Sequence, residues 1–88
     1  MIDLTGQTAL ITGASRGIGE ETARAFSAAG ANLCLIARSA AELGALSAEL
    51  DSPTLVQTCD IADYTAVTAA VDATIKTFGQ LDIVINNA

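Results

Sequence analysis

The residues best suited to hold a ligand form the segment T-G-A-S-R-G-I-G at positions 12–19. The apolar run Thr8–Thr12 precedes it, and residues with helical spacing follow it. Glycines between a strand and a helix adopt backbone angles that a Cβ forbids and let the chain approach a phosphate closely. The free N–H groups of the first helical turn then face an anion. The segment therefore predicts a phosphate-binding turn.

Other residues able to contribute to such a site follow the later apolar runs of the chain. In open α/β sheets, ligands bind at the carboxyl ends of the strands, so residues that directly follow a strand are candidates. These are Arg38 after the run 32–37, Asp60 and Ile61 after the run 54–58, and Asn86, Asn87 and Ala88 at the end of the run 81–86.

The elements that must position these residues alternate regularly between strand and helix. Ser39 begins a capping box with Glu42, Asp63 is a suitable N-cap, and Gly30 and Gly79 are suitable helix ends. In the first helix, the apolar face is predicted to contain Ile18, Thr22, Ala25, Phe26 and Ala29. Strands are predicted at 8–12, 32–37, 54–58 and 81–86, and helices at 17–29, from 39 to before Pro53, and at 63–78.

This β-α-β-α-β-α-β alternation predicts an α/β fold, a doubly wound parallel sheet with helices on both faces. Right-handed crossovers give the strand order 3-2-1-4 and place a switch point between the first and fourth strands. The glycine turn and Asn86 are then expected to meet at one edge of the sheet, where they can share a ligand.

Composition excludes several classes of function. Four basic against ten acidic side chains give the 88 residues a net charge of −6, which repels a nucleic acid backbone. No apolar run approaches the ~20 residues of a membrane helix, and Met1-Ile2-Asp3 lacks the positive start of a signal peptide. We expect a cytoplasmic protein that binds neither nucleic acid nor membrane. With no histidine and no C-x-x-C pair, Cys34 and Cys59 are expected to be free thiols, and no metal site is predicted.

The three segments T-G-A-S-R-G-I-G, C-D-I and N-N-A together resemble the short-chain dehydrogenase/reductase (SDR) family, and the resemblance covers the whole chain in order. It implies a Rossmann-type fold that binds a nicotinamide dinucleotide, with Thr12 and the asparagines bracing the site. The residues that the resemblance assigns to cofactor binding are Gly13, Ser15, Arg16, Gly17, Ile18, Gly19, Arg38, Asp60, Ile61, Asn86, Asn87 and Ala88.

The cofactor is predicted to be NADP(H) rather than NAD(H). An acid at the end of the second strand usually holds a free ribose 2′-hydroxyl, but Ala37 occupies that place. Arg38 follows it and Arg16 lies inside the glycine turn, so two guanidinium groups are available for a 2′-phosphate, although Glu42 nearby partly offsets their field. The alternative for each arginine is a solvated side chain beside a helix.

No catalytic residue is predicted within the chain. The family's Ser, Tyr and Lys lie downstream of N-N-A, and Tyr64 is not followed by a lysine four residues later. Residues 1–88 are therefore expected to be the N-terminal part of a single Rossmann-fold domain, truncated before the catalytic region and inactive alone. The parent is expected to be an oxidoreductase that acts on a small carbonyl or alcohol and forms a homo-oligomer. The alternative is a stand-alone, non-catalytic dinucleotide-binding module.

Overall fold

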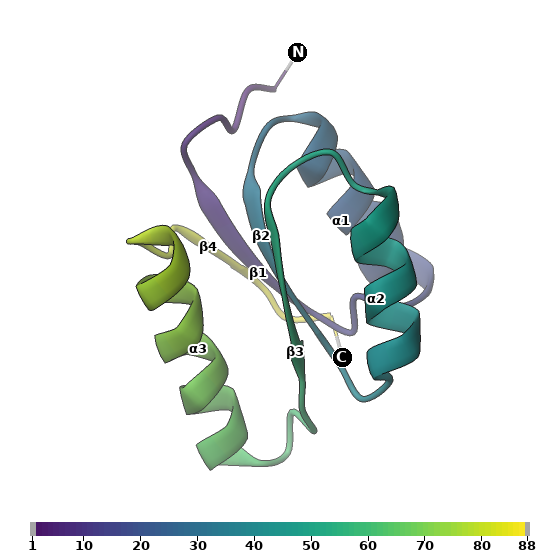
Figure 1. Cartoon of the computed structure of the whole chain (residues 1–88), viewed down its shortest axis with the longest axis vertical. Coiled ribbons are helices and arrows are strands. Elements are labelled where there is room, and N and C mark those ends of the chain that lie inside the picture. The colour runs from purple at the N-terminus through teal and green to yellow at the C-terminus, as the bar shows by residue number, and fades with distance from the viewer. Residues whose placement is uncertain (1, 88) are drawn as a thin grey trace.

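A computed structural model describes residues 2–87, and it forms a single sheet flanked by helices (Figure 1). Strands and helices alternate along the chain as predicted. The strands are β1 (Thr8–Thr12), β2 (Asn32–Ala37), β3 (Thr54–Thr58) and β4 (Ile83–Ile85). The helices are α1 (Gly17–Ala28), α2 (Ala40–Glu49) and α3 (Tyr64–Phe78).

The sheet is parallel throughout, with the strand order β3-β2-β1-β4. Ile11 of β1 pairs with Leu35 of β2 on one side and with Ile85 of β4 on the other. The predicted fold class and strand order are confirmed. Because β1 is central and the chain reverses direction across the sheet between β3 and β4, the glycine turn after β1 lies at the switch point.

The two faces of the sheet have separate apolar cores. Helices α1 and α2 cover one face, and α3 lies on the other (Figure 1). The larger core, on the α1 and α2 side, includes Ile11, Leu33, Leu35, Leu43 and Leu46. The smaller core, on the α3 side, consists of Leu10, Cys34, Ile36 and Ala70. The strands are hydrophobic on both faces, as expected for a sheet that is covered on both sides.

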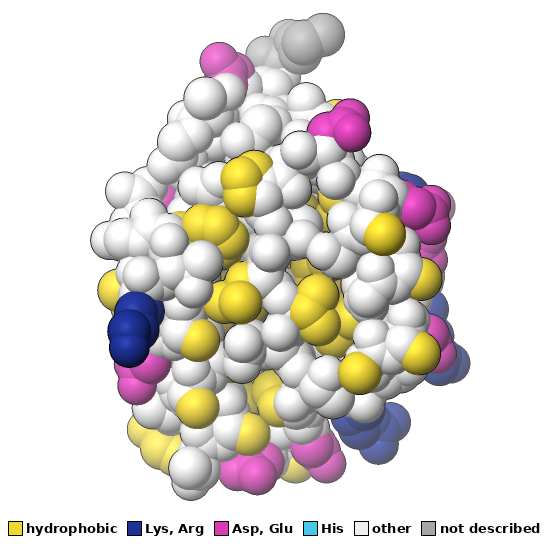
Figure 2. Space-filling view, viewed as in Figure 1, with side chains coloured by type: hydrophobic (Ala, Val, Ile, Leu, Met, Phe, Trp, Pro, Cys, Tyr) yellow, Lys and Arg dark blue, Asp and Glu magenta, His cyan; other side chains and the backbone are white. Residues whose placement is uncertain are grey.

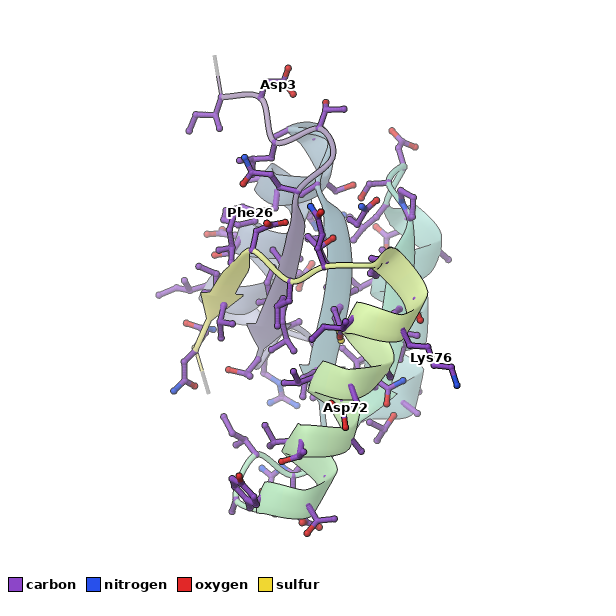
Figure 3. The ribbon with its side chains drawn as sticks, turned by 90° about the vertical axis from the view of Figure 1, so that its left-hand side faces the viewer. Asp3, Phe26, Asp72 and Lys76 are labelled. Atoms are coloured by element: carbon purple, nitrogen blue, oxygen red, sulfur yellow. The ribbon has the colours of Figure 1, made fainter. Side chains whose placement is uncertain are left out.

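Helix α3 covers its face of the sheet only in part. Figure 3 shows β4 to the side of α3, while Asp72 and Lys76 lie on the solvent-exposed part of the helix. Val84 of β4, which pairs with Leu10 of the α3-side core, is 59% exposed. At the opposite edge of the sheet, apolar side chains lie between α3 and α2 and charged ones lie at the margins (Figure 2).

The predicted apolar face of α1 is wrong at Ile18 and Ala25, whereas Phe26 packs against the larger core as predicted. Ile18 is 71% exposed and Ala25 is also exposed, whereas the buried residues are Gly19, Ala23 and Ser27. These three recur every four residues, so they form one helical face of small side chains. At Gly19 an added Cβ would lie within 3 Å of Gly13 O, so the helix packs too closely there for a larger residue.

The ends of the helices follow their local signals. Ser39 Oγ accepts a hydrogen bond from the Glu42 N–H at 3.2 Å, and Asp63 Oδ1 accepts one from the Ala66 N–H at 3.1 Å, so both predicted N-caps are confirmed. Gly79 caps α3 in the left-handed conformation. Helix α1 ends one residue earlier than predicted, at Ala28.

Strand β4 is shorter than the predicted 81–86, and side chains take part in the hydrogen bonding at both of its ends. Before the strand, the Asp82 N–H donates to the Thr8 carbonyl at 2.9 Å. The Asp82 carboxylate accepts a hydrogen bond from the Thr8 N–H at 2.8 Å. After the strand, the Thr12 hydroxyl accepts a hydrogen bond from the Asn87 N–H at 2.9 Å. Only Ile83–Ile85 form the strand itself.

Candidate functional site

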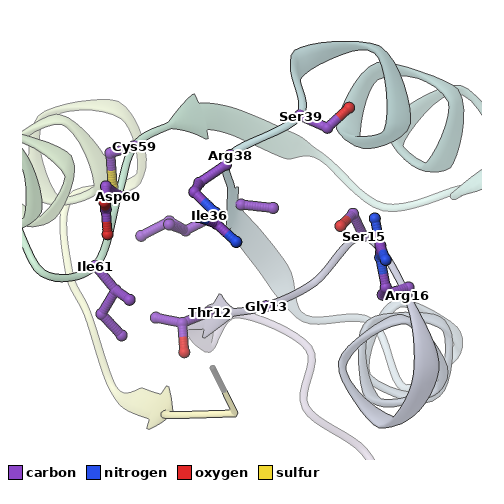
Figure 4. Close-up of a pocket in the computed structure, with 11 residues that line it drawn as sticks. Thr12, Gly13, Ser15, Arg16, Ile36, Arg38, Ser39, Cys59, Asp60 and Ile61 are labelled. Atoms are coloured by element: carbon purple, nitrogen blue, oxygen red, sulfur yellow. The ribbon is translucent and has the colours of Figure 1, made fainter.

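A pocket of about 700 Å³ lies at the carboxyl ends of β1, β2 and β3 (Figure 4). Its walls come from three segments that are far apart in the sequence: the glycine turn, the end of β2 and the segment after β3. The lining residues are Thr12, Gly13, Ser15, Arg16, Ile36, Ala37, Arg38, Ser39, Cys59, Asp60 and Ile61. The pocket is therefore at the edge of the sheet where the sequence predicted a ligand site.

The glycine turn is fixed to the neighbouring strand and opens a helix that has no side-chain cap. The Ala14 N–H donates to the Ile36 carbonyl at 3.1 Å, which ties the turn to β2. Gly13 and Gly17 have φ of 61° and 59°, the left-handed region that glycine adopts most readily. Arg16, the N-cap of α1, gives no side-chain hydrogen bond to the first turn. Among residues 2–87, the first-turn amides therefore have neither intrahelical nor capping partners, a favourable arrangement for an anion.

Gly19 allows α1 to approach the glycine turn closely. A Cβ built on Gly19 would lie within 3 Å of Gly13 O, and at 2.8 Å from both Gly13 C and Asn87 Nδ2. Gly13 is a wall of the pocket, so the contact at Gly19 fixes the position of that wall. The small residue at this position serves helix packing as well as the site.

Thr12 links the glycine turn to the end of β4. Its hydroxyl donates to Asn86 Oδ1 at 3.1 Å and accepts from the Asn87 N–H at 2.9 Å. These bonds join segments more than 70 residues apart in the sequence. Thr12 and the two asparagines thus brace the switch point, as the family resemblance implied.

The two arginines of the pocket differ in their surroundings. Arg38 extends from the end of β2 into the pocket, while Arg16 stands beside Ser15 on the glycine turn (Figure 4). Arg16 Nη2 lies 3.3 Å from Glu42 Oε2. Within residues 2–87, no carboxylate forms an ion pair with Arg38. Ala37, which precedes Arg38, contributes no charge to this part of the pocket.

The segment after β3 forms the third wall. The Cys59 N–H donates to the Ala37 carbonyl at 3.1 Å, which ties this wall to the end of β2. The Asp60 carboxylate accepts a hydrogen bond from the Ala62 N–H at 2.9 Å, which stabilises the turn that leads to α3. Ile61 adds an apolar surface to the pocket.

The two cysteines are free thiols, as predicted. Cys34 pairs in register with Leu55, four residues before Cys59, so the two lie at different heights along the strands. Burial raises the pKa of the Cys34 thiol. The pKa of Cys59 is raised as well, first by burial and then by the negative charges of Asp63 and Asp60. Neither thiol is activated as a nucleophile.

The predicted site residues divide into three groups. Six line the pocket: Gly13, Ser15, Arg16, Arg38, Asp60 and Ile61. Gly17, Ile18 and Gly19 form the start of α1, and Asn86 and Asn87 follow β4, all outside the pocket lining. Ala88 lies outside the described residues.

Five lining residues were not among the predicted cofactor-binding residues: Thr12, Ile36, Ala37, Ser39 and Cys59. Each is at or next to the carboxyl end of a strand. The strand ends were visible in the sequence and are the signal that identifies them.

The described residues contain neither a membrane-spanning helix nor a metal-binding cluster. None of the helices within residues 2–87 is both long and apolar enough to cross a membrane. Over the same residues, no group of three or more His, Cys, Asp or Glu side chains is arranged to hold a metal ion.

Several known proteins are similar to this chain in sequence or in structure. Oxidoreductase UcpA from Salmonella typhimurium is 48% identical, over 97% of this chain and 33% of that protein. The 3-ketoacyl-(acyl-carrier-protein) reductase from Brucella melitensis, solved with NADH, is 36% identical with a TM-score of 0.88, over 93% of this chain and 34% of that one. L-Sorbose reductase from Gluconobacter frateurii, solved with NADPH and L-sorbose, is 34% identical with a TM-score of 0.90, over 99% of this chain and 35% of that one.

These proteins are about three times as long as the part they share with this chain, so the chain spans about a third of the length of the curated relatives it matches. The family model described as short chain dehydrogenase matches residues 7–88, which is nearly the whole sequence. The chain belongs to the short-chain dehydrogenase family.

Proposed function

We propose that residues 1–88 form the cofactor-binding part of an NADP(H)-dependent oxidoreductase, within a single Rossmann-fold domain. The observation that carries this proposal is the composition of the pocket: two arginines face it, and Ala37 stands where an NAD-binding site usually has an acid. The sorbose reductase contains NADPH and the 3-ketoacyl reductase contains NADH, so relatives with either cofactor exist.

The pocket fits a dinucleotide in three respects. The uncapped first turn of α1 suits a pyrophosphate, because its amides and the helix dipole favour negative charge. The close contact at Gly19 leaves the glycine turn compact beside that helix end. Asp60 and Ile61 offer a polar and an apolar contact for an adenine on the opposite wall. We assign cofactor binding to these residues together with Gly13, Ser15 and Gly17.

The preference for NADP(H) follows from the charge near the end of β2. A planar guanidinium can bind a 2′-phosphate through two parallel hydrogen bonds. Charge-assisted bonds of this kind contribute about 1.5–3 kcal/mol each, which corresponds to about ten- to hundredfold discrimination. Arg38 has no ion-pair partner among residues 2–87, so its guanidinium is available for this contact.

The activity of the whole protein is proposed to be hydride transfer to or from a small carbonyl or alcohol. The nicotinamide cofactor, when bound, supplies or accepts the hydride. No tyrosine in the 88 residues is followed four positions later by lysine, so we assign the catalytic residues to a part of the protein outside them and expect these residues alone to be inactive. A homo-oligomer is proposed on family resemblance.

The test changes the charge at the end of β2 in the full-length protein. Dissociation constants for NADPH and NADH are measured by fluorescence titration for the wild type, the double variant Ala37→Asp/Arg38→Ala, and Arg24→Ala as a control. Arg24 is paired with Glu20 and Glu49 away from the pocket, so its removal lowers the net charge and breaks these two pairs without changing the pocket lining. We expect NADPH to bind the wild type and the control more tightly, and the double variant to lose this preference. A wild type that prefers NADH, or a double variant with unchanged preference, would contradict the proposal.

A further inference from the structure

An ion pair links Arg16, which lines the pocket, to Glu42 of α2, which lies outside the lining. Arg16 Nη2, from the glycine turn, lies 3.3 Å from Glu42 Oε2 and 3.5 Å from Glu42 Oε1, in the first turn of α2. The two residues are 26 positions apart in the sequence. Both carboxylate oxygens thus face one guanidinium nitrogen, and the pair is formed at the rim where we place the 2′-phosphate.

The position of Glu42 is set by the cap of α2. Ser39 Oγ accepts a hydrogen bond from the Glu42 N–H, and Glu42 is the third residue of the helix. In a full capping box, the glutamate side chain would return to the backbone N–H of the cap residue. Here the Glu42 carboxylate instead binds Arg16, and no other hydrogen bond of this side chain occurs within residues 2–87.

Other ion pairs of the chain lie elsewhere. Arg24 binds Glu20 at 2.9 Å and Glu49 at 3.1 Å, and Arg24, unlike Arg16, does not line the pocket. Arg38 has no carboxylate partner in the described chain. Of the two arginines in the pocket, one is therefore neutralised by the protein and the other is not.

We infer that Glu42 is a positioning residue that sets the strength of the cofactor preference through Arg16. A phosphate at the rim can use the Arg16 guanidinium only by sharing it with the Glu42 carboxylate or by replacing that carboxylate. Glu42 therefore weakens binding of a 2′-phosphate, while binding of a ligand without this phosphate is little affected. This inference rests on the proposed NADP(H) preference.

The exposure of the pair sets the size of the effect. The side chains of Arg16 and Glu42 are 81% and 42% exposed. Solvent screens such a pair, and exposed ion pairs contribute little free energy. A phosphate dianion can therefore displace the carboxylate, and Glu42 reduces the affinity without blocking the site. We expect removal of the Glu42 charge to raise the affinity for a 2′-phosphate about two- to fivefold.

The experiment uses the full-length protein and two small probes, adenosine 2′,5′-bisphosphate and AMP, which differ only in the 2′-phosphate. Dissociation constants are measured by calorimetry for the wild type, Glu42→Gln and Glu49→Gln. Glu49→Gln is the matched control, because it removes the same charge from the same helix but from the pair with Arg24. The Ser39 bond to the Glu42 backbone does not depend on the carboxylate, so Glu42→Gln retains the helix cap.

We expect Glu42→Gln to bind the bisphosphate two- to fivefold more tightly than the wild type does and to bind AMP with unchanged affinity. Glu49→Gln should bind both probes with the affinity of the wild type. The gain is also expected to disappear when Arg16→Gln is present. Equal behaviour of Glu42→Gln and Glu49→Gln would overturn the inference, as would a gain that persists without Arg16. A wild type that binds the two probes equally contradicts the proposed NADP(H) preference instead, because that result does not depend on the variants.

Discussion

Replacement of Gly19 by alanine tests how closely α1 packs against the glycine turn. The new Cβ would lie at 2.8 Å from Gly13 C and from Asn87 Nδ2, and within 3 Å of Gly13 O. Two of these neighbours are backbone atoms that cannot rotate away, so the helix or the turn must shift. Overpacking of this kind costs up to ~3 kcal/mol, and the better helix propensity of alanine returns ~1 kcal/mol. The net expectation is a loss of about 2 kcal/mol in the free energy of unfolding.

Gly44 provides the matched control for this substitution. It lies inside α2, it is exposed, and a Cβ added there would meet no atom within 4 Å. Gly44→Ala should therefore gain about 0.5–1 kcal/mol from helix propensity alone. The same chemical change thus has opposite signs at the two positions, which separates packing from backbone entropy.

The assay is urea unfolding of the full-length protein and both variants, with NADPH affinity measured in parallel. Gly19→Ala is also expected to bind the cofactor more weakly, because the displaced residue, Gly13, is a wall of the pocket. If Gly19→Ala is as stable as Gly44→Ala, the claim that α1 packs closely against the glycine turn is wrong. If Gly19→Ala is destabilised but keeps full affinity, the link between that contact and the pocket is refuted.

Three further outcomes are expected. Thr12→Val should lower the free energy of unfolding by about 1–3 kcal/mol, because the Asn87 N–H loses its acceptor. Amide hydrogen exchange at Asn87 should then become faster, and an unchanged exchange rate would contradict the bracing role of Thr12. Ser39→Ala should cost about 0.5–2 kcal/mol in urea unfolding through loss of the α2 cap, and a neutral result would show that this cap contributes little. Burial raises the pKa of Cys34, so the folded state holds the thiol proton more tightly than the unfolded state does. Stability from this group should be complete below the usual thiol pKa of ~8.5 and fall as pH rises above it. Cys34→Ser should reduce that slope and leave the part due to Cys59, whose pKa is also raised, and an unchanged slope would contradict the assignment.

Local signals in the sequence were sufficient for much of the fold. The caps at Ser39 and Asp63 depend on residues three positions apart, and both predictions are confirmed. The order of the strands followed from the handedness of β-α-β units. Such features depend on residues close in the sequence or on general chirality, so they could be predicted without coordinates.

Contacts between distant segments could not be predicted in this way. The Asp82 carboxylate accepts a hydrogen bond from the Thr8 N–H, 74 residues away in the sequence. The exposed face of α1 contains Ile18 because the buried face requires small residues such as Gly19, and hydrophobicity alone gave the opposite arrangement. The sequence indicated that Glu42 lies near the two arginines, but its pairing with Arg16 and not with Arg38 depends on how the glycine turn and α2 approach one another. Each of these follows from tertiary packing.

The central claim is that the pocket between the glycine turn and the end of β2 binds the 2′-phosphate end of the cofactor. The most direct measurement is the change in backbone amide chemical shifts when the full-length protein is titrated with NADP⁺ and, separately, with NAD⁺. We predict shifts at residues 13–17 with both ligands, and larger shifts at Arg38 and Ser39 with NADP⁺. Equal shifts at Arg38 and Ser39 with the two ligands, or shifts confined to the shallow hollow beside Tyr64 and Thr68 on α3, would contradict the account.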